Sequence, residues 1–107
     1  MAPRQKESGI AGKITAWLTQ RMKEGAPLYF EHRSGAGGFN YRKGVPDLWA
    51  AVNGAHIEIE VKTPDGELSP LQEKFRWRCE EIFHCAYIAP RSSEEAIAFL
   101  ERFLTRE

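Results

Sequence analysis

Residues 45–62 have the sequence VPDLWAAVNGAHIEIEVK, and this stretch decides the fold. Asn53-Gly54 lies between two apolar-rich runs, which is the pattern of a two-residue type I′ hairpin turn. Once these two residues form the turn, the register follows by counting outward on both strands. The predicted pairs are Val52–Ala55, Ala50–Ile57, Leu48–Ile59 and, farthest from the turn, Asp47–Glu60.

The predicted register separates the side chains of the hairpin by chemistry. Successive side chains point to opposite faces of a strand, so each strand contributes every second residue to a face. One face is wholly apolar and the other carries the charges, and a slip of one residue would bury charge in the core. The apolar face holds Leu48, Ala50, Val52, Ala55, Ile57, Ile59 and Val61, and the other holds Asp47, Trp49, Ala51, His56, Glu58, Glu60 and Lys62.

Asp47 and Glu60 form a predicted pair of carboxylates. Directly opposed residues in an antiparallel pair have Cβ atoms roughly 4.5–5.5 Å apart, and like charges there are destabilising. A cation would compensate, and Mg²⁺ is usually held by one or two carboxylates together with phosphate oxygens of the substrate. Such a metal polarises a phosphate and lowers the pKa of a bound water. The hairpin therefore predicts a metal site suited to hydrolysis of a phosphodiester.

Lys62 follows Glu60 by two residues and projects from the same face. Its ammonium could orient the attacking water and offset the charge that grows on the phosphate in the transition state. Each fragment also has a structural interpretation, because Pro-Asp is a frequent turn dipeptide and Glu-x-Lys is a common solvated ion pair. The register that brings Asp47, Glu60 and Lys62 together favours catalysis.

Stretches outside the hairpin also have the spacing of regular structure. Apolar residues recur at helical spacing in the first stretch, aromatic residues fill a short strand after it, and a serine-proline pair has the form of a helix start. The predicted elements are a helix over Glu7–Lys23, a strand over Leu28–His32, a helix from Ser69-Pro70 to about Phe83, a strand over Ala86–Ala89 and a helix that opens at Ser92. The predicted order is αβββαβα in a single domain over residues 1–107.

The charge of the chain is balanced but unevenly distributed. The chain has fifteen Lys and Arg residues and fifteen Asp and Glu residues, so its net charge is zero. It therefore lacks the overall positive charge that many nucleic-acid-binding proteins have. Residues 33–46 nevertheless contain no acid and several glycines, which suits either a loop that approaches DNA or an ordinary surface loop. The candidates for DNA contact are Arg33, Arg42 and Lys43 in this stretch and Lys74 in the following helix.

Several classes of protein are disfavoured by the sequence. Cys79 and Cys85 lack the spacing of a zinc knuckle and are expected to be free thiols, and the three histidines form no zinc set. No apolar run approaches the roughly 20 residues of a membrane span, and the first residues lack the apolar stretch of a signal peptide. We therefore expect an intracellular, soluble protein.

Three motifs together resemble the VRR-NUC nucleases of the PD-(D/E)xK superfamily. The motifs are Gly44-Val45-Pro46-Asp47-Leu48, Ile59-Glu60-Val61-Lys62, and Leu68-Ser69 with Gln72. The resemblance spans most of the chain and implies an α/β fold of the α+β mixed-sheet type, with a restriction-endonuclease-like αβββαβ core and a C-terminal helix. It implies that Asp47, Glu60 and the Val61 carbonyl bind Mg²⁺ or Mn²⁺, and that Lys62 is the catalytic lysine.

Three further polar residues have two interpretations each. Glu7 resembles the first-helix glutamate that completes the metal site in this family, although an acid in a first helical turn is also favoured by the helix dipole. Gln72 resembles the family's glutamine after the lysine strand, and it also fits a capping box with Ser69. Glu58 is expected to be a partner for a basic loop residue rather than a metal ligand.

The resemblance implies a structure-selective endonuclease that cleaves branched DNA, such as Holliday junctions, in the cytoplasm of a bacterial or phage-infected cell. Cutting both strands of a junction needs two active sites, so a homodimer is expected. Trp77, which lies off the predicted inner stripe Leu71–Phe75–Cys79–Ile82, and exposed parts of the first helix are candidates for the dimer surface. The alternatives are a nuclease for flaps or for DNA of any structure, and a catalytically inactive DNA-binding module.

Overall fold

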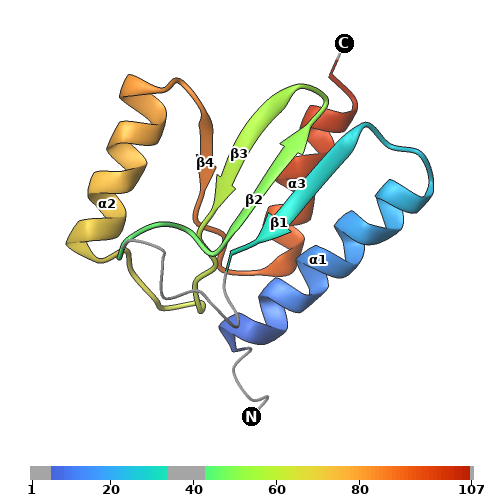
Figure 1. Ribbon diagram of the computed structural model, residues 1–107. Coiled ribbons are helices and arrows are strands. Elements are labelled where there is room, and N and C mark those ends of the chain that lie inside the picture. Colours follow the sequence, from blue (N-terminus) through green and yellow to red (C-terminus); the bar gives the residue numbers. More distant parts are fainter. Residues whose placement is uncertain (1–5, 34–42, 107) are drawn as a thin grey trace.

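The computed structural model describes residues 6–33 and 43–106, which form a four-stranded sheet with helices around it (Figure 1). The elements are α1 (Glu7–Lys23), β1 (Leu28–His32), β2 (Leu48–Val52), β3 (Ala55–Ile59), α2 (Pro70–Trp77), the π-helical turn η2 (Arg78–Ile82), β4 (Ala86–Ile88) and α3 (Ser93–Leu104). The predicted order αβββαβα is confirmed. None of the helices in the described ranges is both long and apolar enough to cross a membrane.

The hairpin register is confirmed for every pair within the strands. Val52 lies opposite Ala55 and Leu48 opposite Ile59, with the intermediate pairs as predicted. Asn53 and Gly54 have φ angles of 49° and 87°, the left-handed backbone that a type I′ turn requires. Strand β1 pairs antiparallel with β2, and β4 pairs parallel with β3, so the sheet is mixed in the order β1-β2-β3-β4.

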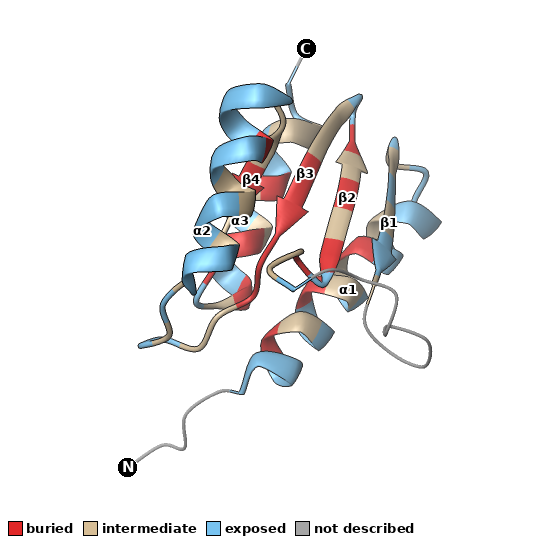
Figure 2. Ribbon diagram, turned by 60° about the vertical axis from the view of Figure 1, so that its left-hand side comes forward, coloured by how far each residue is buried: buried red, intermediate tan, exposed pale blue. Residues whose placement is uncertain are grey.

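The apolar face of the hairpin forms the core, where it packs against α1 and α3 (Figures 1 and 2). Burial of these side chains removes apolar surface from water and is the main stabilising contribution to such a core. The face is apolar as predicted, and of its members only Ala55 is half-buried. The buried core consists of Ile10, Ile14, Leu18, Leu48, Ala50, Val52, Ile57, Ile59, Val61, Ala96 and Leu100.

The predicted inner stripe of the second helix is wrong at both ends. Cys79 is buried, but Leu71 and Ile82 are each 50% exposed. The helix changes from α to π geometry after Trp77, and each π-helical residue advances the helix by a smaller angle than an α-helical one. The change of phase turns Ile82 away from the sheet. Trp77 is 57% exposed, as expected.

Asn53 binds the end of the last helix as well as forming the turn. Its side-chain Nδ2 donates hydrogen bonds to the carbonyl of Phe103 at 3.1 Å and to that of Arg106 at 2.7 Å. The last carbonyls of a helix have no partner within the helix, so a side-chain donor stabilises them. The turn and the C-terminal end of α3 are therefore joined by one side chain.

Asn53→Asp is expected to lower the free energy of unfolding by about 1–2 kcal/mol. Aspartate has the same size and also tolerates positive φ, but its carboxylate has no donor and faces the negative end of the helix dipole. Urea unfolding followed by circular dichroism measures the change. Asn53→Gly is the control, because it keeps the turn backbone and removes the donor without adding charge. Equal stability of the aspartate variant and the wild type would contradict the role of the side chain.

Candidate active site

Glu60 and Lys62 lie on an extended segment that continues β3 beside the end of β4. The Glu60 N–H donates to the Ile88 carbonyl, and the Lys62 N–H donates to the Pro90 carbonyl, both at 2.9 Å. Val61, between them, is buried in the core. Because side chains alternate along an extended segment, Glu60 and Lys62 project to the opposite face, as predicted.

Glu60 is a buried residue, only 5% exposed. Its pKa is raised to about 7, with burial as the largest cause; the Lys62 ammonium lowers this pKa, and the carboxylates of Asp47 and Glu7 raise it. Burial disfavours the charged form of a carboxyl group, and nearby like charges disfavour it further. The structure therefore gathers the charges of Asp47, Glu7 and Lys62 around a buried glutamate.

Asp47 lies at the entrance to β2, one residue before the last pair of the hairpin. Its carbonyl accepts a hydrogen bond from the Arg33 N–H, which extends the β1–β2 ladder by one step. Asp47 is exposed and lines a cleft of about 480 Å³ together with Glu7, Phe30 and His32. The cleft brings the beginning of α1 next to the beginning of β2, so Glu7 and Asp47 share one hollow.

Gln72 connects Lys62 to the beginning of α2. Its Oε1 accepts hydrogen bonds from the Lys62 Nζ and from the Ser69 N–H, both at 2.8 Å. The Gln72 N–H in turn donates to the Ser69 hydroxyl at 3.2 Å, which completes a capping box. The two interpretations of Gln72 are therefore compatible, because one oxygen atom serves both the helix start and the lysine.

Glu58 is paired with a basic loop residue, as expected. Arg33 donates from Nη1 and Nη2 to the two carboxylate oxygens at 2.6 and 2.8 Å. The Nε2 atom of His56 lies within hydrogen-bonding distance of the same carboxylate. Glu58 is 4% exposed, and its charge is matched within the protein.

The four candidates for DNA contact lie in different surroundings. Lys43 is exposed four residues before Asp47, and Lys74 is exposed on α2 two residues after Gln72. The Arg33 guanidinium is half-buried against Glu58. Arg42 lies outside the described residues.

The residues present fit a divalent cation. Carboxylate and carbonyl oxygens are the ligands that Mg²⁺ and Mn²⁺ prefer. Across residues 6–33 and 43–106, no three His, Cys, Asp or Glu side chains converge into a complete cage. Mg²⁺ usually completes its shell with waters and phosphate oxygens, so two carboxylates and one carbonyl suffice. Burial is the main cause of the raised pKa of Glu60, and the charges of Asp47 and Glu7 add to it. A cation bound beside Glu60 would favour its charged form.

Tyr87 is a neighbour of the site that the sequence interpretation missed. It lies opposite Glu58 in the β3–β4 pairing, and its buried hydroxyl has no hydrogen-bond partner within the described part of the chain. Burial raises its pKa, and the charge of Glu60 raises it further. Alternation along residues 86–89 could have placed Tyr87 on the face of Glu58 once β4 was known to run parallel to β3.

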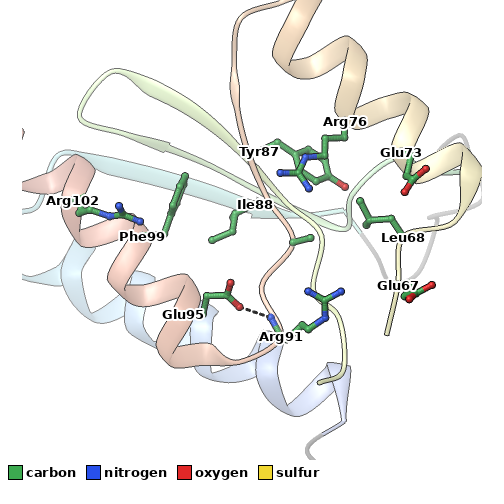
Figure 3. Close-up of a pocket in the computed structure, with 11 residues that line it drawn as sticks. Glu67, Leu68, Glu73, Arg76, Tyr87, Ile88, Arg91, Glu95, Phe99 and Arg102 are labelled. Atoms are coloured by element: carbon green, nitrogen blue, oxygen red, sulfur yellow. Dashed lines mark hydrogen bonds between the residues drawn. The ribbon is translucent and has the colours of Figure 1, made fainter. Parts of the chain in front are cut away.

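A larger hollow of about 700 Å³ lies beside β4, between α2 and α3 (Figure 3). Three arginines and three glutamates line it, so its formal charges balance and it has no preference for an anion. None of Asp47, Glu60 and Lys62 lines this hollow. The charged members of its wall are Glu67, Glu73, Arg76, Arg91, Glu95 and Arg102.

Comparisons with known proteins agree with the architecture. No protein-family model matches the sequence, and no curated protein matches it either. A solved structure described as a VRR_NUC domain is similar to this chain with a TM-score of 0.60 and 20% sequence identity. The match covers 86% of this chain and 95% of that one. The chain therefore has the fold of a VRR-NUC domain, as the motifs implied.

Proposed function

We propose that this protein is an endonuclease that uses a divalent metal ion to hydrolyse phosphodiester bonds in DNA. The observation that carries the proposal is the buried Glu60 carboxyl group, whose pKa responds to Asp47, Glu7 and Lys62 at one end of the hairpin. Perturbed ionisable groups that gather beside a cleft are typical of catalytic sites. The VRR-NUC fold supports the same conclusion.

Each residue of the site has a proposed role. Asp47, Glu60 and the Val61 carbonyl would hold Mg²⁺ or Mn²⁺, with Glu7 as a further oxygen donor at the same cleft. The bound ion would supply Lewis-acid activation of the phosphodiester. The Lys62 ammonium would stabilise the negative charge that develops on the phosphate oxygens. The Gln72 carbonyl oxygen keeps that ammonium in place.

The proposed substrate is branched DNA, such as a Holliday junction, and the proposed active form is a homodimer in the cytoplasm. Paired cuts on two strands need two copies of a single-site domain. The exposed Trp77 and the outer face of α1 are the candidate contact surfaces. The candidate DNA contacts are Lys43, Lys74, Arg33 and Arg42.

Lys62→Ala is expected to reduce cleavage of a synthetic four-way junction by about 100- to 1000-fold, because it removes one charged donor from the transition state. Binding of Mn²⁺ and of the junction should persist, since the proposed metal ligands and DNA contacts are residues other than Lys62. Gel assays with Mg²⁺ or EDTA measure cleavage on junction, flap and linear duplex substrates. Arg102→Ala, which removes a positive charge at an exposed position on α3, is the control.

The substrate panel also separates the alternatives. Preferential cutting of the junction supports structure selectivity, whereas equal cutting of all substrates indicates a nuclease without structural preference. DNA binding without cleavage under Mg²⁺ or Mn²⁺ would identify an inactive module and contradict the proposed reaction. Sedimentation with and without the junction tests the homodimer.

Metal affinity and cleavage rate are expected to fall as the pH is lowered through about 7, where Glu60 takes up a proton. A carboxylate must lose its proton to bind a metal, so protonation competes with the ion. Mn²⁺ titrations between pH 5.5 and 8.5 measure the affinity. An affinity that stays constant across this range would exclude Glu60 as a ligand with a raised pKa.

Glu60→Gln is expected to stabilise the metal-free protein at pH 8 by about 1–3 kcal/mol. The pKa of Glu60 is higher in the folded chain than its ordinary value of 4.5, so folded protein binds more protons between these values. The contribution of Glu60 to stability therefore falls as pH rises from about 4.5 to 7. Urea unfolding in EDTA measures the difference, with the exposed Glu73→Gln as control. A less stable variant would contradict the electrostatic argument.

A further inference from the structure

Arg33 binds the peptide carbonyls on both sides of Asp47. Its backbone N–H donates to the Asp47 carbonyl, and its guanidinium Nη1 donates to the Pro46 carbonyl at 2.8 Å. These carbonyls belong to the two peptide units that flank the Asp47 Cα atom. Fixing both units restrains the φ and ψ angles of Asp47, and with them the direction in which its carboxylate leaves the backbone.

Glu58 in turn fixes the Arg33 side chain. The two groups form a bidentate pair at 2.6 and 2.8 Å, a geometry that restricts the guanidinium to one plane and one direction. The side chains are 5% and 17% exposed, so little water competes for the contact. Glu58 lies on β3, two residues before Glu60 and on the same face. The pair therefore links the strand that carries Glu60 to the peptide units around Asp47.

A simple ion pair would explain only part of this arrangement. Neutralising the buried Glu58 needs one positive charge, which a lysine could supply. A single ammonium, however, lacks the planar fork of five N–H donors that lets a guanidinium bind two carboxylate oxygens and a carbonyl at once. The contact to Pro46 and the backbone bond to Asp47 serve no purpose in neutralising Glu58.

We propose that Arg33 and Glu58 are positioning residues that set the direction of the Asp47 carboxylate relative to Glu60. The inference rests on the proposed function for its catalytic meaning, but the geometry that it describes is independent of any bound ion. Arg33 and Glu58 act through the backbone of Asp47, and this role requires no contact with substrate or metal.

The first test measures backbone hydrogen exchange in the full chain, without metal. Arg33→Lys and Glu58→Gln are expected to accelerate hydrogen exchange of the residue 33 amide by about tenfold, because the bond to the Asp47 carbonyl loosens. The Asn53 amide, which donates to the Pro27 carbonyl at 2.7 Å at the other end of β2, is the internal control and should not change. Circular dichroism checks that each variant is folded, and Glu58→Gln carries the test if Arg33→Lys does not fold.

The second test measures the affinity of the carboxylate site for Mn²⁺ by electron paramagnetic resonance. Both variants are expected to bind Mn²⁺ about 10- to 100-fold more weakly than the wild type, which is the usual cost of losing a residue that orients a ligand. Arg21→Lys is the matched control, because Arg21 pairs with Glu24 at the C-terminal end of α1, the end opposite Glu7. Its Mn²⁺ affinity should equal that of the wild type.

The outcomes separate the inference from the proposed function. Faster exchange at residue 33 together with weaker Mn²⁺ binding supports the positioning role. Unchanged exchange in both variants overturns it, and so does faster exchange with unchanged Mn²⁺ affinity. A wild-type protein that binds no Mn²⁺ and cleaves no DNA contradicts the proposed function instead, and the exchange rates then still decide whether Arg33 holds Asp47.

Discussion

The left-handed backbone of Asn53 and Gly54 is the constraint on which the rest of the structure depends. A two-residue turn permits one register, and that register decides which side chains of β2 and β3 enter the core. A shift of one residue would exchange the apolar set for the charged set. By the same count Asp47 precedes and Glu60 follows the residues of the last ladder pair, Leu48–Ile59, at the open end of the hairpin. The conformation of the turn therefore determines both which side chains form the core and where Asp47 and Glu60 lie.

The sequence interpretation succeeded where the determining interactions are local. The turn, the alternation of side chains, the capping box at Ser69 and the partner role of Glu58 were all predictable from short spacings. It failed at the inner face of the second helix, where the chain changes from α to π geometry after Trp77 and no spacing in the sequence had indicated that change. It also missed Tyr87, since the parallel register of β4 is set by tertiary packing and not by a turn.

Two buried glutamates on one strand show two different solutions to the cost of burying charge. Glu58 is neutralised inside the protein by the Arg33 guanidinium. Burial raises the pKa of Glu60, Lys62 lowers it, and the two acids Asp47 and Glu7 raise it, so that it stays above its ordinary value. Buried charges with a structural role are usually paired with an opposite charge, whereas ionisable groups at functional sites often keep a strongly shifted pKa. Glu58 and Glu60 therefore differ in their surroundings, since the charge of Glu58 is paired and the pKa of Glu60 is raised.

The shared oxygen of Gln72 makes α2 and Lys62 mechanically dependent on each other. One atom accepts from the first turn of the helix and from the ammonium, so a tilt of the helix start changes the restraint on the lysine. The same helix presents Lys74 and Trp77 to solvent. A macromolecule that binds to this outer surface would therefore contact the helix whose first turn holds the Lys62 ammonium.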